Sequence, residues 1–146
     1  MTITNDSEFK SAITKLTRAG QRQVGARFAE SVLALCKDAR VKHTIATAMR
    51  DDITEDELAA ALDSAKKASV DSFTLCGKEC DWNSQAGHFV AEAALACLKS
   101  ATDPAWEAAM HARMARTSES IATGQGTENA ESAVQYRILD KFLSSE

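Results

Sequence analysis

The sequence predicts an all-α fold, and three observations support this. Alanine is abundant, proline occurs once, at Pro104, and aromatic residues make up only 5% of the chain. Alanine has the highest helix propensity, whereas proline is the strongest helix breaker. Apolar residues also recur three and four positions apart along most of the chain. We therefore expect a single domain, residues 1–146, folded as a compact and mostly antiparallel bundle of six or seven helices.

Apolar stripes predict the first two helices. A short first helix carries Phe9, Ile13 and Leu16 on one face, and Asn5 or Asp6 is expected to cap it. Gly20 then predicts a break or bend. The second helix is expected to span residues 21–37, and its predicted buried stripe contains Val24, Phe28, Val32 and Leu35.

The next two helices follow from spacing and from a capping signal. A third helical segment lies within residues 38–52, where apolar residues recur four apart. Thr54 and Glu57 then form the pattern of a capping box, in which two side chains satisfy free N–H groups reciprocally. The helix after this box is expected to span residues 55–75, with Leu58, Leu62, Ala65, Val70 and Phe73 facing inward.

Turn residues delimit the last three helices. Gly77 is expected to end the preceding helix, and Asp81 to cap one that runs to about residue 98. Pro104, after Asp103, predicts the next start. Residues 124–126 read Gly-Gln-Gly and predict a turn, after which Thr127 or Asn129 caps the last helix. The apolar stripes of these last two helices are expected to be Trp106, Met110 and Met114, followed by Ala130, Val134, Ile138 and Phe142.

The charge is distributed unevenly along the chain. Residues 1–50 carry nine Lys/Arg and four Asp/Glu, whereas residues 51–146 carry eight and seventeen. This asymmetry arises either from ordinary solvated helix faces or from an acidic binding surface. The net charge of -4 does not suggest nucleic-acid binding. No long apolar run or secretion signal is evident, so we expect no membrane contact and a cytoplasmic location.

The strongest local acidic feature is a group of carboxylates at the start of the predicted 55–75 helix. Capping accounts for Glu57, but Asp51, Asp52, Glu55 and Asp56 exceed what a helix start needs. These carboxylates either only stabilise the start of this helix, or they also contact a basic protein partner. Charge complementarity would then speed association with that partner.

Two cysteines and a histidine lie close together in the sequence. Cys76 and Cys80 form a C-x3-C pattern, and His88 is a possible third metal ligand, but no fourth ligand is near in sequence. Metal binding and reversible redox chemistry are therefore alternatives to a plain corner between helices, and we expect the corner, with no cofactor. Cys36 and Cys97 lie in apolar stripes, where cysteine acts as a small hydrophobic residue.

Two histidine–carboxylate pairs have helical spacing. His88 and Glu92 are four apart, as are Glu107 and His111, and a hairpin would bring Glu92 towards His111. Di-iron bundles use Glu-x-x-His twice, a pattern that is absent here, so we expect ion pairs. The sequence also has no G-x-S-x-G motif and no phosphate-binding glycine loop. It gives no reason to predict an enzyme.

Several segments together resemble a known family. They are RFAESVL at residues 27–33, ITEDE at 53–57, Gly-His at 87–88 and QYRIL at 135–139. In these the chain is similar to alanine-rich, all-helical immunity proteins of bacterial polymorphic-toxin systems. The resemblance implies a non-enzymatic inhibitor that binds and neutralises a cognate toxin, and it supplies no catalytic residues. A metal- or redox-responsive protein and a subunit of a homo-oligomer are the alternatives.

Overall fold

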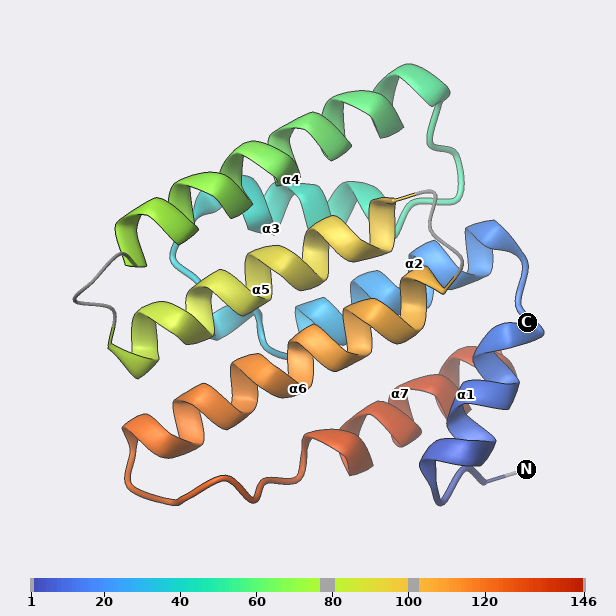
Figure 1. Cartoon of the computed structure of the whole chain (residues 1–146). Coiled ribbons are helices and arrows are strands. Elements are labelled where there is room, and N and C mark those ends of the chain that lie inside the picture. Colours follow the sequence, from blue (N-terminus) through green and yellow to red (C-terminus); the bar gives the residue numbers. More distant parts are fainter. Residues whose placement is uncertain (1, 77–80, 100–102, 146) are drawn as a thin grey trace.

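The described part of the chain consists of helices and connections, without a strand (Figure 1). The structure is a computed structural model, and it describes residues 2–76, 81–99 and 103–145. The predicted all-α bundle is confirmed. Its elements are α1 (Asp6–Thr14), α2 (Arg18–Glu30), the 3₁₀ turn η1 (Leu33–Leu35), α3 (Ala39–Ala48), α4 (Glu55–Cys76), α5 (Trp82–Leu98), α6 (Pro104–Ala122) and α7 (Glu131–Ser144).

Helix α5 is the centre of the bundle. It packs against α4 and α6 on its two sides and against α2 and α3 behind. Figure 1 shows α4, α5 and α6 side by side with alternating direction, and α7 and α1 along the lower edge. Nine residues of α5 are buried, five of them alanine, so the helix is covered on most of its circumference.

Alanine residues form most of the larger core cluster, which joins α2 to α6. Small side chains allow the helix backbones to approach closely. At Gly25 in α2 the approach leaves no room for a side chain, because an added Cβ would lie 2.9 Å from the Cβ of Cys97. The abundance of alanine therefore determines both the helical content and the tight packing of this half of the molecule.

Aromatic rings pack together in the second core cluster, where α1 and α7 meet α2 and α6. The ring of Phe9 lies 5.4 Å from Phe28, 5.4 Å from Tyr136 and 6.1 Å from Trp106, measured between centroids. Tilted ring pairs at these distances add to the stabilisation from burial. Large rings thus fill the space that alanine cannot fill between these helices.

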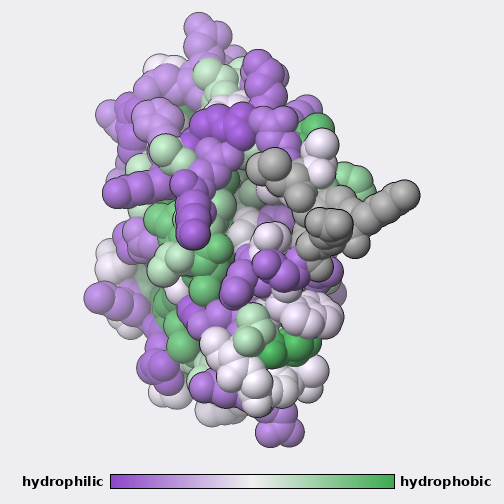
Figure 2. All heavy atoms as spheres, turned by 90° about the vertical axis from the view of Figure 1, so that its left-hand side faces the viewer, coloured by the Kyte–Doolittle hydropathy of each residue, from purple (hydrophilic) through white to green (hydrophobic). Residues whose placement is uncertain are grey.

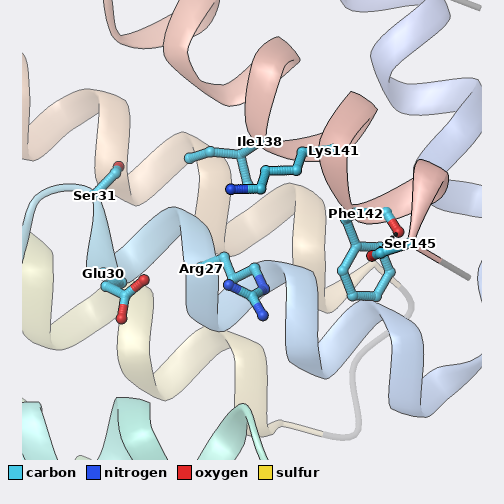
Figure 3. A pocket seen from close by; sticks show the side chains of 7 residues that line it. All are labelled: Arg27, Glu30, Ser31, Ile138, Lys141, Phe142 and Ser145. Carbon is cyan, nitrogen blue, oxygen red and sulfur yellow. Dashed lines mark hydrogen bonds between the residues drawn. The ribbon is translucent and has the colours of Figure 1, made fainter.

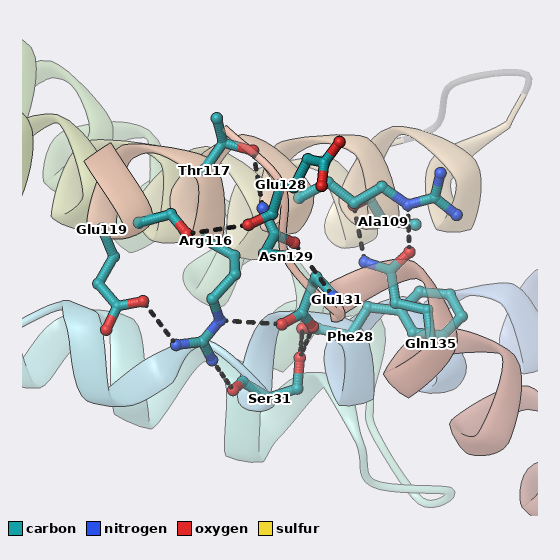
Figure 4. Close-up of polar contacts among 12 residues, drawn as sticks. Phe28, Ser31, Ala109, Arg116, Thr117, Glu119, Glu128, Asn129, Glu131 and Gln135 are labelled. Carbon is teal, nitrogen blue, oxygen red and sulfur yellow. Dashed lines mark hydrogen bonds and ion pairs between the residues drawn. The ribbon is translucent and has the colours of Figure 1, made fainter. Parts of the chain in front are cut away.

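A buried carboxylate attaches the start of α7 to the rest of the bundle (Figure 4). Glu131 is only 3% exposed. Its Oε1 lies 3.1 Å from Arg116 Nε, and its Oε2 accepts from Ser31 Oγ at 2.7 Å. Arg116 also donates to the carbonyl of Ser31 at 3.1 Å. A buried charge requires such partners, because leaving it unpaired is strongly unfavourable.

A second polar anchor lies one turn further along α7. Gln135 is fully buried. Its Oε1 accepts a hydrogen bond from Arg113 Nε at 2.8 Å, and its Nε2 donates one to the carbonyl of Ala109 at 2.9 Å. Arg113 also pairs with Asp6 at 2.8 Å, and Tyr136 donates to the same carboxylate at 2.7 Å. Bonds to Arg113 hold the pKa of Asp6 below its usual value. Thus α1 and α7 are both attached to α6 through one arginine.

The structure corrects the extent of the second helix. Helix α2 ends at Glu30, and a turn and η1 replace its predicted last part. Ser31 Oγ donates to the carbonyl of Phe28 as well as to Glu131, so the side chain competes for the bonds of a continuing helix. Gly20 lies inside α2 rather than at a bend, and its N–H bonds Thr17 Oγ1 at 3.0 Å as part of the helix cap.

The inward face of α4 was predicted wrongly over its second half. Val70 and Phe73 are 63% and 70% exposed. Ala65 is buried as predicted, and the other buried residues of this helix are Ala61, Ala68 and Ser69. These residues keep the helical spacing and allow α5 to pack closely, whereas Val70 and Phe73 lie on the outer side.

Similar corrections hold in α6 and α7. The alanines of α6 are buried, whereas Met114 is 44% exposed. In α7 the fully inward residues are Glu131, Gln135 and Leu139, and the predicted Val134, Ile138 and Phe142 are half-buried. Residue size therefore predicted burial poorly wherever alanine or a paired polar residue occupied the contact.

Most predicted helix starts are confirmed. The N–H of Glu57 donates a hydrogen bond to Thr54 Oγ1, and the N–H of Thr54 donates one to Glu57 Oε1, both at 3.1 Å. Asp81 accepts from the N–H of Ser84 at 2.7 Å. At α7 the N-cap residue is Ala130 rather than the predicted Thr127 or Asn129, although Asn129 accepts from the N–H of Glu131 at 3.1 Å.

Two glycine turns were also predicted. Gly124 and Gly126 have φ of 79° and 76°, a left-handed conformation that favours glycine, so the predicted turn before α7 is confirmed. The predicted stop at Gly77 lies outside the described residues.

Candidate functional site

The predicted carboxylates form a continuous surface between α3 and α4, which we call the acidic edge: Asp51, Asp52, Glu55 and Asp56. Helix α3 ends at Ala48, and α4 begins at Glu55. All four carboxylate residues are exposed. The connection between the two helices therefore places negative charge on one edge of the bundle.

Half of the acidic edge is held by neighbouring side chains. Arg50 pairs with Asp52 at 3.1 Å and with Glu57 at 2.6 Å. Its hydrogen bonds hold the pKa of both carboxyl groups below their usual values, so both stay charged at neutral pH. Asp51 accepts a hydrogen bond from the amide of Gln23 on α2. The position of this half is thus fixed by a neighbouring helix.

The other half of the acidic edge has no neutralising partner in the described part of the chain. Glu55 and Asp56 form no ion pair or side-chain hydrogen bond with any residue in the described ranges. The nearby Arg22 directs its guanidinium to the carbonyls of Ala48 and Arg50, at 3.0 and 2.7 Å. The positive end of the α4 dipole favours Glu55 and Asp56 but offsets only part of their charge.

The structure describes only part of the alternative cysteine site. Residues 77–80, and therefore Cys80, lie outside the described residues, as does the side chain of Cys76. His88 is described, and it lies half-buried on α5 between α4 and α6. Among the described residues, no group of three or more His, Cys, Asp or Glu side chains is arranged to hold a metal ion.

His88 belongs to a hydrogen-bonded row that joins α4 to α5. Its Nδ1 lies 2.8 Å from Ser72 Oγ, and its Nε2 lies 3.5 Å from Glu92 Oε1. Ser69 Oγ donates to the same carboxylate oxygen at 2.5 Å. The predicted His88–Glu92 contact is thus present within α5, and the hydroxyls of Ser69 and Ser72 join these two residues to α4.

The order hydroxyl, imidazole, carboxylate also occurs in nucleophilic catalysis, so its geometry needs comparison. Ser72 lies inside α4, where backbone N–H groups bond within the helix, so the helix itself offers no oxyanion hole. Ser72 Oγ also donates to the carbonyl of Ser69 at 2.9 Å. The row therefore suits a latch between helices better than acyl transfer.

His111 on α6 lies next to this row but does not pair with it. Its ring stacks on Phe89, with centroids 6.4 Å apart. Its Nδ1 is buried without a hydrogen-bond partner among the described residues, and burial lowers its pKa, although Glu92 and Glu107 act in the opposite direction. The ion pair expected at His111 is not found among the described contacts, because neither Glu92 nor Glu107 lies within 4.0 Å of its ring nitrogens, although both carboxylates act to raise its pKa.

Two further cysteines behave as predicted. Cys97 is 2% exposed, its Sγ donates to the carbonyl of Ala94 at 3.1 Å, and burial raises its pKa to about 12. Cys36 is half-buried, and burial raises its pKa as well. Neither thiol forms a disulfide. Both have the environment of small hydrophobic side chains rather than of reactive thiolates.

Two surface features were missed from the sequence. Large hydrophobic side chains are exposed on α4, α5 and α6, namely Val70, Phe73, Trp82 and Met114. Figure 2 looks onto the end where α4 finishes and α5 begins, and it shows hydrophobic patches bordered by hydrophilic residues. A groove also lies between α2 and α7, whose residues are too far apart in sequence to be associated by any local pattern.

Comparisons of the chain with protein-family profiles, with curated proteins and with solved structures find no match. Within the described ranges, every helix is too short or too polar to cross a bilayer. The site is therefore interpreted from its own geometry.

Proposed function

We propose that this chain is a protein-binding module that contacts a basic partner through the acidic edge. The observation that supports this most is the pair of exposed carboxylates, Glu55 and Asp56, which lack a cation partner within the described residues. The resemblance to immunity proteins suggests the kind of partner, a toxin that the module neutralises. The cytoplasmic location and the bacterial toxin stay predictions from the sequence.

The geometry gives the acidic edge two useful properties for such a role. The Thr54–Glu57 capping box and the Arg50 bonds fix the start of α4, so little conformational entropy is lost when a partner binds. Exposed carboxylates on one edge also steer a positively charged partner and accelerate association. Blocking the basic surface of a toxin is the inhibitory mechanism that follows.

The test compares two variants of equal net charge. One neutralises the acidic edge by D51N, D52N, E55Q and D56N, and the other removes four exposed carboxylates elsewhere by E30Q, D63N, E107Q and E128Q. Both are used to capture partners from the source cell, and affinities for the captured protein are then measured. We expect the edge variant to bind about tenfold or more weakly, since charge pairs at interfaces couple by more than about 1.4 kcal/mol. Equal affinities for the two variants would refute the proposed surface.

A second candidate function, self-association, is favoured by the exposed hydrophobic residues of α4. Val70 and Phe73 are three residues apart on one helix face, and exposed apolar patches mark interaction sites. The alanine residues of the larger core cluster are buried within the chain itself and are not free for such a contact. Light scattering of wild type, F73E and the control K66E tests it, since an oligomer that F73E alone dissociates would support self-association, and a wild-type monomer would eliminate it.

A further inference from the structure

A groove runs between the ends of α2 and α7, on a part of the surface separate from the acidic edge (Figure 3). Its volume is about 470 Å³, a size typical of pockets for small organic molecules. Arg27 comes from the last turn of α2, and Lys141 from the last turn of α7. The groove therefore exists only because the two helices are folded against each other.

The two cations in the groove have no counterion among the residues that the structure describes. Neither Arg27 nor Lys141 forms an ion pair with any residue in the described part of the chain. Figure 3 shows both side chains between Glu30 on one side and Phe142 on the other. Glu30 also lines the groove, yet it pairs with neither cation. Two positive charges thus line the groove without an ion pair to its one lining carboxylate, Glu30.

Helix dipoles account for only part of this arrangement. Each cation lies near the negative end of its own helix, where a positive side chain is favoured. That end carries the equivalent of roughly half a charge, and solvent screens it, so most of each positive charge stays available. The groove hydroxyls do not compete for an anion, because Ser31 and Ser145 donate to the carbonyls of Phe28 and Phe142.

The wall beside the cations is apolar. Ile138 and Phe142 line the groove, and both are half-buried at the surface of the aromatic core cluster. Small-molecule sites combine such apolar walls with a few polar groups that fix orientation. The groove thus offers two different surfaces at short range, one for a negative group and one for a hydrocarbon body.

We propose that this groove binds an amphipathic organic carboxylate, a molecule with one carboxylate and a short hydrocarbon chain or ring. The carboxylate would accept hydrogen bonds from Arg27 and Lys141, which are stronger than neutral ones because the donors are charged. The hydrocarbon would cover Ile138 and Phe142. A small inorganic anion would use only the cations, and a neutral alcohol only the wall, so each would bind more weakly than the carboxylate.

Octanoate is the probe that tests this proposal. It has about ten non-hydrogen atoms, for which ligand efficiency predicts a dissociation constant on the order of millimolar. The experiment titrates octanoate, acetate, inorganic phosphate and octanol separately into the ¹⁵N-labelled chain and follows backbone shifts. We expect saturable shifts with octanoate, concentrated in residues of α2 and α7 around the groove, and at least about tenfold weaker binding of the other three probes.

Charge variants locate the binding. The double variant R27Q/K141Q should bind octanoate about tenfold more weakly, because each of its two substitutions removes a charge-assisted hydrogen bond. K42Q combined with K66Q removes the same charge from α3 and α4 and should leave binding unchanged, and the spectra of both variants report whether they are folded. The proposal is overturned if octanoate does not bind, if octanol or phosphate binds as tightly, or if the R27Q/K141Q variant binds like wild type.

Discussion

The two core clusters hold their helices together in different ways. The cluster around α5 is built mostly of alanine and places helix backbones close together. The cluster around α1 and α7 uses aromatic rings, with Arg113 and Arg116 forming polar bonds at its border. Helices α2 and α6 contribute to both clusters, so the difference arises from different side chains of the same helices.

This difference determines which changes each cluster tolerates. A contact between alanines can hardly be weakened by truncation, because the side chain is already a single methyl group. It has no space for a larger residue, so it is sensitive to enlargement. A contact between rings is sensitive to truncation, which leaves a cavity. Buried charges on α7 add a third sensitivity, the loss of a partner. Four predictions test this contrast, from the largest expected effect to the smallest.

Truncation of a buried ring should have the largest effect. Phe28 is fully buried in the aromatic cluster, and Phe28→Ala should lower the free energy of unfolding by about 3–5 kcal/mol. Phe73 is 70% exposed, so Phe73→Ala should change stability by less than about 0.5 kcal/mol. Urea unfolding of the two variants measures the contrast. A large loss in F73A would show that α4 packs with its other face.

Removing an arginine anchor should be the next largest effect. Arg116→Ala leaves the carboxylate of Glu131 buried without its cation and should cost about 3 kcal/mol. Arg113→Ala should cost about half as much, because its ion-pair partner Asp6 is half exposed and can be hydrated. Chemical unfolding again gives both values. Equal and small losses would mean that α7 does not depend on these bonds.

Enlargement should matter most at the alanine interface. Gly25→Ala introduces a Cβ at 2.9 Å from the Cβ of Cys97, so the helices must move apart, at a cost of about 1–3 kcal/mol. Gly20→Ala in the same helix is the matched control. Its nearest contact would be 3.3 Å from Thr17 Oγ1, and it should be neutral or stabilising by up to about 1 kcal/mol. Thermal unfolding measures the stability of both variants. If G25A were more stable than G20A, the result would contradict close packing at Gly25.

The smallest expected effect depends on pH and on His111. Burial holds its pKa below the ordinary value of 6.5, so the unfolded chain binds the proton more tightly. The contribution of neutral His111 to the free energy of unfolding is fully present above about pH 6.5. It is lost as the pH falls towards the pKa of the folded state, by at most about 1.4 kcal/mol for each pH unit. His111→Gln should remove this loss between about pH 7 and pH 5. Parallel stability curves for wild type and variant would contradict the assignment.

The sequence predicted most of the fold because the signals for helices are local. The Thr54–Glu57 box, the Asp81 cap and the glycine turn at residues 124–126 act within a few residues, and all three are confirmed. The inward faces depend on which neighbour packs against them. Val70 and Phe73 therefore had the expected spacing for burial but lie outside, while alanine occupies the contact.

The candidate sites divide in the same way. The acidic edge was visible because its carboxylates are adjacent in sequence, and the structure adds which of them lack a cation. The Arg27–Lys141 groove could not be predicted, because the two residues approach each other only when α7 folds against α2. The buried Glu131 was equally hidden, since its partner Arg116 lies in another helix.

The most direct test of the proposed function is the salt dependence of association with the captured partner. Rates would be measured for wild type and for the variant with the acidic edge neutralised, over a range of ionic strengths. The proposal predicts that the wild-type rate falls steeply as salt screens the carboxylates, and that the variant starts slower and depends less on salt. Identical salt dependence for the two proteins would contradict the proposal and assign binding to another surface.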